Sequence, residues 1–556
     1  EGLGAYSFSG NTHVTAVTLP NTITSIGNAA SNNCSKLSSI TIPSLVASIG
    51  QEAFRNCTGL TYIVSECVTP PTLGSNCFEN VSTTIPVYVP KGSVPAYKAA
   101  SGWSSFSHIV SVKTSNWSAP TASDAVYVDA NYTLTDDVAV ADVYFASEDY
   151  VLTIPEGKTL TVTGSIDATS ASQIVLEDGG QLVSNSVVQA TLKKEIIGYG
   201  ENDQVETGWY FIASPVVEDF VPTETMLSNT YDLYQLNNTT WENYKPHANN
   251  ANPGFNLVNG RGYLYANSDD VTLSFAGVIK PYASTQNVAV STGWNLIGNP
   301  FTYDVYINQD YYKMNTDGSA ITSVTKGQET IAPCTGIVVN ATANGSVIFS
   351  KDAPVGVANN GNVQMVLTQI VANRDGSNLE KVIDNAVVSF NEGDNLEKFY
   401  FGNQDANIYV PQGTEEYAIA ASKAQGEMPL NFRVNVNSIY TLTVNAEDVE
   451  MNYLHLIDNM TGANIDLLSN PSYTFDAKAN DYENRFRLVF VAQNNDDDLD
   501  DDFAFISNGQ IIVNGEGTLQ VIDMMGRIVL CGDTMRYIST AGMKQGVYVL
   551  RLVESN

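Results

Sequence analysis

The sequence predicts a mainly β protein that begins with a repeat solenoid and continues through several further β domains. Three observations lead to this prediction. Segments near the N-terminus recur at a fixed interval along the chain. The distance in sequence from Pro20 to Pro43 is one such interval. Most of the remaining chain alternates apolar and polar residues, which is the period of a half-buried strand. The full chain of 556 residues is also too long for one core, because a domain typically holds about 150 residues.

Composition and charge exclude several classes of function. Charged residues make up only 15% of the chain, less than the exposed faces of a helical cytosolic protein usually carry. Lys and Arg number 26 and Asp and Glu number 59, so the net charge is −33. Such a chain repels phosphate backbones and anionic lipid headgroups, so we expect it to bind neither nucleic acid nor a membrane surface. No apolar run reaches the roughly 18 residues of a transmembrane segment.

The N-terminal repeat extends over three aligned segments, 10–27, 33–50 and 56–74. A fixed period of about 20–29 residues is typical of a leucine-rich-repeat solenoid. Each coil of such a solenoid leaves an apolar edge that only the next coil covers, so the same positions must recur. The recurring pairs share one spacing: Pro20 and Pro43, Ile26 and Ile49, Gly27 and Gly50, and Ala30 and Ala53.

Strand alternation predicts which side chains face the core of the solenoid. Cys34 and Cys57 occupy equivalent positions of consecutive coils, where we expect buried, reduced thiols in place of a reactive or crosslinked pair. The inward set is Val14, Leu37, Leu60, Val17, Ile40 and Ile63. The outward set is Ala16, Ser39 and Tyr62 beside Thr18, Thr41 and Val64.

We take the outward sheet face as the candidate ligand-binding surface, with Ser39, Thr41, Tyr62 and Val64 as its binding residues. These side chains are small or uncharged in a protein of net charge −33, whereas a solvated face without function more often carries charges. Tyr62 is an aromatic residue among small ones, and exposed aromatics contribute strongly to interfaces. The alternative is that Ser and Thr stand here only because they suit strands.

The stretch QEAFRNCTGLTYI (51–63) resembles the BspA-like leucine-rich repeat, and the resemblance covers residues 1–112. It implies an exported protein, associated with the outer membrane at the cell surface or released outside the cell, with a role in adhesion. Ser31 stands where the family has Phe. We therefore expect one thinly packed coil.

The end of the repeat region, residues 85–109, also fits the family. Ser93 is expected to cap a short helix, with Pro95 in its first turn and Gly102 ending it. Three aromatic side chains are predicted to cover the open end of the solenoid: Tyr97, Trp103 and Phe106.

Residues 113–197 predict a small β-solenoid or stacked-hairpin module, because apolar and polar residues alternate almost continuously. A second period, one residue shorter than the first, supports this prediction. It separates Ile154 from Leu176, Gly157 from Gly179, and Leu160 from Leu182.

Residues 198–353 predict a β-sandwich with two related halves, because TGWYFIASPV (207–216) recurs as TGWNLIGNPF (292–301). Trp209 and Trp294 stand at equivalent positions of this repeat. Exposed tryptophans can stack on sugar rings, but a Trp beside Gly in an apolar run more often belongs to a core.

Residues 354–493 predict a further β-sandwich of short strands and resemble a module common in exported proteins of Gram-negative gut anaerobes. The acidic stretch 494–502 predicts a solvated linker, since it lacks the Gly and Glu spacing of a calcium-binding loop. Residues 503–556 resemble the C-terminal sorting domain of type IX secretion, a small immunoglobulin-like sandwich. The residues that match its motifs are Val521, Asp523, Gly526, Arg527 and Gly546–Leu552.

The sequence contains no constellation typical of an enzyme, so we predict no catalytic residue, no metal ligand and no cofactor. Its four histidines lie far apart, and the HExxH, GxSxG, GxxxxGK and CxxC motifs are absent. We predict a monomeric binding protein that attaches, through the leucine-rich-repeat face, to a protein ligand on a host or bacterial surface. The alternative is a glycan-binding surface protein that uses Trp209, Trp241 or Trp294 on the sandwiches.

Overall fold

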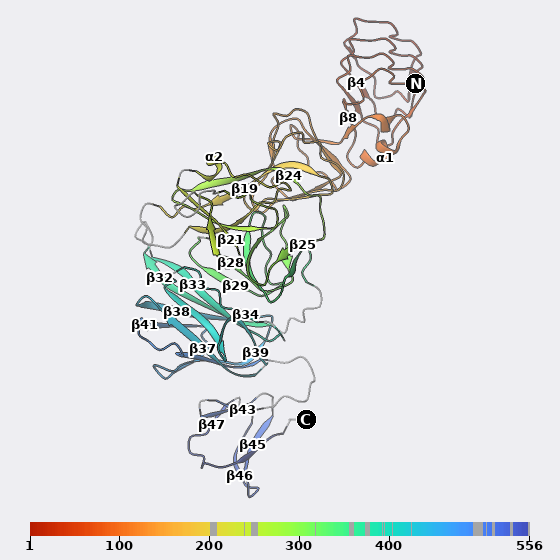
Figure 1. Ribbon diagram of the computed structural model, residues 1–556. Coiled ribbons are helices and arrows are strands. Elements are labelled where there is room, and N and C mark those ends of the chain that lie inside the picture. The colour runs from red at the N-terminus through yellow and green to blue at the C-terminus, as the bar shows by residue number, and fades with distance from the viewer. Residues whose placement is uncertain are drawn as a thin grey trace.

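The computed structural model shows a nearly all-β chain, with 49% of residues in strands and 3% in helices, which confirms the predicted fold class. The molecule is elongated, with the N-terminal solenoid at one end and the C-terminal unit at the other (Figure 1). The acidic stretch 494–502 lies outside the described residues. The structure describes all residues except 201–207, 229, 238–239, 246–253, 317, 355–360, 373–377, 392, 394, 403, 424, 493–503, 508, 514–516, 534–536 and 554–556.

Two parallel sheets run through the N-terminal solenoid. Neighbouring strands pair residues that are equivalent in the repeat, such as Ile40 with Ile63 and Ile26 with Ile49, so the sequence period is the length of one coil. The first sheet contains β2 (Ala16–Val17), β4 (Ser39–Ile42), β6 (Tyr62–Ser65), β8 (Pro86–Tyr88) and β9 (His108–Val110). The second contains β1 (Gly2–Leu3), β3 (Ser25–Ile26), β5 (Ser48–Ile49) and β7 (Thr72–Leu73).

The inward side chains of the solenoid form its core. Gly27 and Gly50 recur because a Cβ atom at either position would lie 2.6 Å from a backbone nitrogen of the preceding coil. Val14 and Val17, in an outer coil, are half-buried. The others are at most 4% exposed, as predicted: Leu37, Leu60, Ile40 and Ile63.

One coil is packed differently from the next. Ser31 and Phe54 stand at equivalent positions of consecutive coils, and both are fully buried. The Phe54 ring stacks on Phe78 with 5.4 Å between ring centroids. The Ser31 hydroxyl has no hydrogen-bond partner among the described residues. The coil of Ser31 therefore buries a hydroxyl where its neighbour buries a ring.

A short cap closes the solenoid. It consists of α1 (Val94–Ala99) and a 3₁₀ turn, η1 (Trp103–Ser105). Tyr97 donates from its hydroxyl to the Cys67 carbonyl at 2.8 Å, and Trp103 donates from its indole to the Pro71 carbonyl at 2.8 Å. Both rings and that of Phe106 are buried, as predicted.

The prediction that Ser93 caps this helix through its side chain is wrong. Ser93 has φ −92° and ψ −12°, a helical conformation, and its side chain makes no capping hydrogen bond. A capping side chain needs an extended backbone to reach back to the free N–H groups. Pro95 does lie in the first turn, as expected.

A second parallel solenoid follows the first. Ile154 pairs with Leu176 and Leu160 with Leu182, so the second sequence period is again the length of one coil. Three parallel ladders make up this unit. They are β10 (Val112–Lys113), β11 (Ala125–Val128) and β14 (Asp142–Phe145); β12 (Tyr132–Thr133), β15 (Leu152–Ile154), β17 (Ile174–Leu176) and β19 (Val188–Ile196); and β13 (Val138–Val140), β16 (Thr159–Val162) and β18 (Gln181–Ser184).

The last strand of this solenoid joins it to the next unit. β19 pairs antiparallel with β24 (Val271–Ile279) along its whole length. A single apolar cluster therefore contains residues from both sides of residue 197, such as Leu192 and Phe275. The domain boundaries proposed from the sequence stay predictions. The apolar core described here extends across the proposed boundary at residue 197.

The repeated TGW segments begin two four-stranded sheets of the same topology. In each sheet the strand order is first, fourth, second, third. One sheet contains β20 (Trp209–Ala213), β21 (Tyr231–Asn237), β22 (Thr240–Asn243) and β23 (Gly262–Asn267). The other contains β26 (Gly293–Gly298), β28 (Tyr311–Met314), β29 (Ile321–Val324) and β30 (Gly336–Ala341).

The two sheets meet around an approximate twofold axis. The Ala213 N–H donates to the Cys334 carbonyl at 2.9 Å, and the Gly298 N–H donates to the Gly260 carbonyl at 3.0 Å. Ala213 and Gly298 hold equivalent positions of the TGW repeat. Gly260 and Cys334 both have positive φ, 86° and 58°. Each half therefore gives the other the same hydrogen bond.

The remaining elements of this unit lie beside the two sheets. The helix α2 (Glu224–Leu227), capped by the Thr223 hydroxyl, was not predicted from the sequence. A three-stranded sheet contains β25 (Thr285–Val290), β31 (Gly345–Ser350) and β27 (Tyr306–Ile307).

The next unit is one continuous hydrogen-bonded ladder folded around one apolar core. β35 makes a corner in this ladder, because residues 410–412 pair with β36 while residues 406–409 pair with β37. The strand order is β40-β39-β42-β37-β35-β36-β33-β32-β38-β41, with β34 beside β36. The strands are β32 (Asn362–Ala372), β33 (Asn378–Ser389), β34 (Leu396–Glu397), β35 (Ala406–Gln412), β36 (Glu415–Ala421), β37 (Gln425–Val434), β38 (Ser438–Glu447), β39 (Met451–Asp458), β40 (Ala463–Asp466), β41 (Ser472–Ala477) and β42 (Phe486–Ala492).

The C-terminal unit consists of two small antiparallel sheets over an apolar cluster that includes Leu519 and Val521. One sheet contains β43 (Ala504–Ser507), β44 (Gln510–Val513) and β47 (Tyr537–Ser539), and the other β46 (Ile528–Asp533), β45 (Thr518–Asp523) and β48 (Tyr548–Val553). Across the described ranges, no helix combines the length and the hydrophobicity needed to cross a membrane.

Replacing Ile40 with Ala should lower the free energy of unfolding by about 2–5 kcal/mol, because a buried aliphatic side chain is lost and leaves a cavity. Urea denaturation measures the change. Thr41→Ala, on the exposed face of the same strand, is the control and should change stability by less than about 0.5 kcal/mol. Equal losses in the two variants would contradict the alternation of this strand.

Replacing Ser31 with Ala should stabilise the solenoid by about 1 kcal/mol, because the buried hydroxyl has no partner and its removal relieves a desolvation cost. Ser93→Ala provides a second case, since the buried Ser93 hydroxyl also has no partner among the described residues. Thermal unfolding of the two variants tests this, and a lower melting temperature in both would show that the hydroxyls are in fact bonded.

Candidate binding surface

The four residues predicted to bind a ligand lie together on the outer face of the first solenoid sheet. Ser39 pairs with Tyr62 and Thr41 pairs with Val64 across β4 and β6. The Tyr62 side chain is 39% exposed, Thr41 is exposed, and Ser39 and Val64 are half-buried. The alternation rule therefore placed these side chains on one surface.

A row of tyrosines extends this face beyond the leucine-rich repeats. The Tyr62 ring meets the edge of Tyr88 with 5.9 Å between centroids, and Tyr88 meets Tyr127 at 5.9 Å in the same way. Tyr88 lies on β8 and Tyr127 on β11, so the row crosses from the first solenoid to the second. We call Tyr62, Tyr88 and Tyr127 the tyrosine row. Edge-to-face contacts between aromatic rings are favourable and fix their orientation.

A lysine lies over the middle of the tyrosine row. The Lys113 ammonium lies 3.6 Å from the centroid of the Tyr88 ring, a cation–π contact. Burial raises the pKa of Tyr88 well above its usual value, with smaller contributions from Tyr127 and Asp129, so its hydroxyl stays protonated. The row therefore presents aromatic edges, neutral hydroxyls and one cation.

His108 connects the two solenoids beside the tyrosine row. Its Nδ1 lies 2.8 Å from the Thr84 carbonyl and its Nε2 lies 3.2 Å from an Asp167 carboxylate oxygen. Its ring packs on Tyr144 with 4.8 Å between centroids. The hydrogen bond to Asp167 raises the pKa of His108 against the opposing effect of burial, and the bond to Thr84 raises it further. Protonated His108 donates from both ring nitrogens, one to each solenoid.

A second contact fixes the same junction. Lys98 of α1 pairs with Asp142 of β14, whose side chain is only 5% exposed. The other oxygen of Asp142 accepts from the backbone N–H and the hydroxyl of Ser165 at 3.0 and 2.9 Å. The tyrosine row is therefore carried by two units that polar contacts and a shared core hold in one orientation.

Charge is distributed unevenly between this region and the rest of the chain. Residues 1–112 hold four basic and four acidic side chains, so their formal charges cancel, and the whole net charge of −33 belongs to residues 113–556. The basic side chains are Lys36, Arg55, Lys91 and Lys98, and the acidic ones are Glu1, Glu52, Glu66 and Glu79. We call residues 1–112, which carry no net charge, the neutral head, and residues 113–556 the acidic body.

The tryptophans considered for sugar binding lie at the contact between two units. Trp294 packs on Phe399 with 4.7 Å between centroids, and Trp209 packs on Phe401 at 6.5 Å, ring edge to ring face. Trp241 also meets Phe401, at 6.5 Å. All three indoles are half-buried in one apolar cluster. This packing fits the interpretation that Trp209 and Trp294 belong to a core. The half-buried rings do not form a flat exposed surface on which a sugar could stack.

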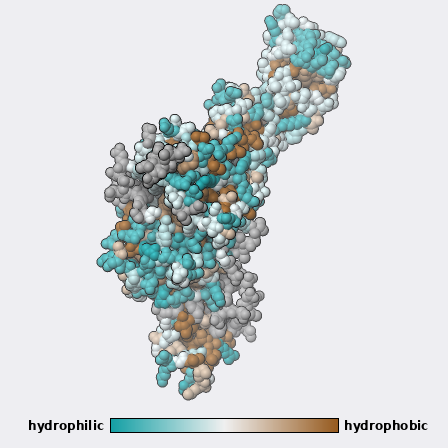
Figure 2. All heavy atoms as spheres, in the orientation of Figure 1, coloured by the Kyte–Doolittle hydropathy of each residue, from teal (hydrophilic) through white to brown (hydrophobic). Residues whose placement is uncertain are grey.

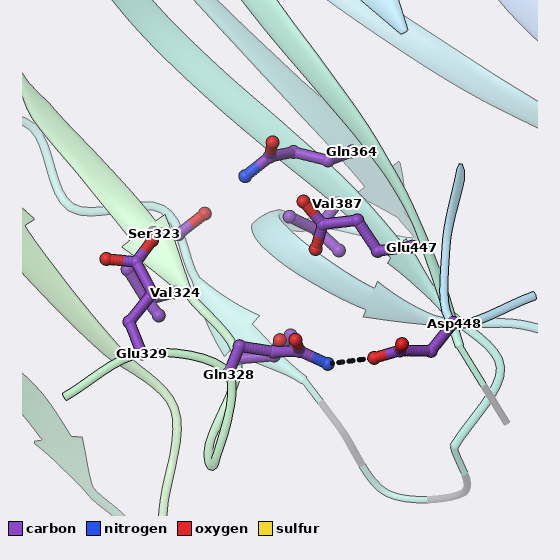
Figure 3. Close-up of a pocket in the computed structure, with 9 residues that line it drawn as sticks. Ser323, Val324, Gln328, Glu329, Gln364, Val387, Glu447 and Asp448 are labelled. Atoms are coloured by element: carbon purple, nitrogen blue, oxygen red, sulfur yellow. Dashed lines mark hydrogen bonds between the residues drawn. The ribbon is translucent and has the colours of Figure 1, made fainter. Parts of the chain in front are cut away.

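A polar cavity of about 310 Å³ lies between the same two units. Figure 3 shows acidic side chains converging on it, with Gln328 donating to Asp448 at 3.1 Å. Burial raises the pKa of Glu447, and the nearby Glu329 and Asp448 raise it further. The described residues contain no group of three or more His, Cys, Asp or Glu side chains arranged to hold a metal ion. The cavity is lined by Ser323, Val324, Thr325, Gln328, Glu329, Gln364, Val387, Glu447 and Asp448.

The cysteines of the first solenoid are buried, so their thiols are shielded from reagents in solvent. Cys34 donates from its thiol to the Phe8 carbonyl and Cys57 donates to the Ser31 carbonyl, each at 3.1 Å, so equivalent thiols bond to equivalent carbonyls of the preceding coil. Burial raises the pKa of Cys57 to about 12. Of the six unpaired cysteines, only Cys531 is exposed.

A second exposed apolar surface lies on the C-terminal unit, which Figure 2 shows in brown. Met524, Met525 and Val547 are 74%, 81% and 70% exposed. On β48, Val549 is 53% exposed on the face opposite the core. The alternation of residues along β48 is the sequence signal for this surface, whereas the motifs of the segment do not indicate it.

The contact of His108 with Asp167 should make stability depend on pH. The pKa of His108 is raised in the folded state, so its stabilisation is fully present below the unfolded value of about 6.5 and is lost as pH rises through the folded value. His108→Gln should remove this decline, measured as the unfolding midpoint between about pH 5.5 and 8.5. His13→Gln, an exposed position in the same solenoid, is the control. A decline that persists in His108→Gln would assign the pH dependence to another group.

Comparison with known proteins agrees with this geometry over the N-terminal region. The family model described as BspA type Leucine rich repeat region matches in six copies across residues 1–110. Neither a curated protein nor a solved structure matches the chain. Residues 1–110 are therefore similar to the BspA-type leucine-rich repeats, as the motif at 51–63 predicted.

Proposed function

We propose that this protein is a non-enzymatic binding protein of the cell surface or the extracellular medium, and that it attaches to a protein ligand through the tyrosine row and the adjoining face of β4 and β6. The repeat family is commonly associated with surface adhesion, which supports this class of function. The ligand is expected on a host or bacterial surface.

The observation that carries the proposal is the composition of this face. Ser39, Thr41 and Val64 are small and uncharged, and Tyr62 stands beside them as the exposed end of the tyrosine row. Tyrosine combines a large apolar ring with a hydrogen-bonding hydroxyl and is enriched at protein interfaces. Rings already held edge to face lose little conformational freedom on binding, which favours affinity.

The charge distribution supports the same assignment. A neutral head approaches acidic and basic partners equally, whereas the acidic body repels the many anionic surfaces that cells and matrices present. Binding that is centred on residues 1–112, with Tyr127 at its edge, therefore reduces the repulsion that the rest of the chain would cause.

Export fits the C-terminal unit. Asp523 accepts from the backbone N–H groups of Met525 and Arg527 and from the Arg527 guanidinium at 2.8–3.0 Å, so three of the residues that match the sorting motif, Asp523, Gly526 and Arg527, lie in one tight turn. We include in the proposal that this unit acts as a sorting domain, with its exposed apolar face toward the export machinery.

The alternative is a glycan-binding protein that uses Trp209, Trp241 or Trp294. These indoles are half-buried against Phe399 and Phe401, which leaves little of their faces for a sugar ring. A carbohydrate array run beside a panel of matrix and cell-surface proteins separates the two functions.

Tyr62→Ala should weaken binding to the protein ligand that the panel identifies by about tenfold or more, the effect of losing an interface aromatic worth at least about 1.4 kcal/mol, without lowering the melting temperature. Surface plasmon resonance and differential scanning calorimetry measure the two quantities. Tyr482→Ala, which removes a tyrosine 47% exposed on another unit, is the matched control. Unchanged affinity in Tyr62→Ala, or binding only to glycans, would move the site to the sandwiches.

A further inference from the structure

Lys398 and Asp384 form a fully buried ion pair. The Lys398 ammonium lies 2.6 Å from Asp384 Oδ1, and each side chain is 1% exposed. Asp384 lies on β33, and Lys398 begins the segment 398–401 that follows β34. Side chains so deeply buried are shielded from solvent, so their charges lack the solvation that stabilises ions.

We propose that Lys398 and Asp384 join in an intramolecular isopeptide bond between Lys398 Nζ and Asp384 Cγ. The bond would form spontaneously after folding, with loss of one water molecule. It needs no oxidant, reductant or second substrate, because an amine and a carboxylic acid contain all the atoms of the amide and the water.

The surroundings of the pair favour its neutral, reactive forms. Burial raises the pKa of Asp384, against the opposing effect of Lys398, and burial lowers the pKa of Lys398, against the opposing effect of Asp384. Both shifts favour transfer of one proton from Nζ to Oδ1 along the hydrogen bond. A free amine is a nucleophile, and a protonated carboxyl group is a better acceptor of that nucleophile than a carboxylate.

The neighbouring backbone is placed to stabilise the reaction. When the Nζ lone pair attacks Cγ, negative charge develops on Oδ2, which accepts from the Ile408 N–H at 2.8 Å. A second Nζ proton then moves to Oδ1, the Cγ–Oδ1 bond breaks and water leaves. The remaining N–H of the new amide faces the Asn385 carbonyl, now 3.2 Å from Nζ. Both polar atoms of the product amide therefore have partners already in place.

The crosslink would lie where two units are joined. Lys398 is buried in the unit of residues 362–492, whereas Tyr400 is 42% exposed and donates to Glu416 at the surface of that unit. Phe399 and Phe401 point the other way and pack on Trp294 and Trp209. A covalent bond at Lys398 would fasten this segment to β33 and hold both phenylalanine rings against the two tryptophans.

Intact mass is the first test. The purified full-length protein, incubated until its mass is constant, should weigh about 18 Da less than its sequence sum, the mass of one water. Lys398→Arg retains the cation but forms no such amide, and its mass should equal the sequence sum. Asp384→Asn would lose about 17 Da, since ammonia replaces water as the leaving group.

Peptide mapping locates the bond, because a succinimide at an Asp-Gly sequence also loses water. Trypsin should fail to cleave after Lys398. A protease that cleaves after Glu397 should leave the fragment that contains Asp384 joined, through the new amide, to the fragment that begins at Lys398. The buried pair of Arg485 and Asp458, 3.0 Å apart and 2% and 0% exposed, is the matched control and should yield separate peptides. A wild-type mass equal to the sequence sum, or normal cleavage after Lys398, would show that the pair is only an ion pair and overturn the proposal.

Discussion

The need to cover the open ends of parallel solenoids organises this molecule. A parallel sheet cannot end in solvent without exposing unpaired N–H and C=O groups and an apolar cross-section. The first solenoid ends under α1 and the rings of Tyr97, Trp103 and Phe106. The second ends at β19, which reverses the direction of pairing by joining β24 along its whole length. Each closure also connects one unit to the next, so the two solenoids and the unit that follows them share continuous cores and are not loosely tethered domains.

The approximate twofold axis in the middle unit explains how the following unit is attached. Because the two TGW sheets have the same topology, they present two equivalent Trp–Tyr pairs, Trp209 with Tyr234 and Trp294 with Tyr312. In an extended segment alternate side chains point the same way. Phe399 therefore packs on the pair Trp294 and Tyr312 while Phe401 packs on Trp209, and Lys398 is directed into the next core. The two related halves thus each contribute a tryptophan to the contact with one segment of the neighbouring unit.

The fixed junction between the two solenoids also orients the tyrosine row. Lys98 with Asp142, and His108 with Asp167, fix the junction on which Tyr88 and Tyr127 meet. A row that crossed a mobile hinge would lose its order when the units moved. Here residues 1–112 carry no net charge, and the aromatic face is oriented relative to the rest of an elongated, acidic chain.

The sequence by itself determined the features that are local or periodic. The first repeat period predicted the N-terminal solenoid, because identical coils must bury identical positions, and alternation placed Ser39, Thr41, Tyr62 and Val64 on one face. The second period predicted a β-solenoid or a stacked-hairpin module, and the parallel pairing in the structure is that of a solenoid. Only the tertiary structure decided which distant residues meet. Tyr88 and Tyr127 belong to different repeats with different periods, and Lys398 and Asp384 lie on either side of a chain reversal, so no spacing rule brings them together. Such contacts depend on how whole units close on one another, which is a property of packing and not of sequence pattern.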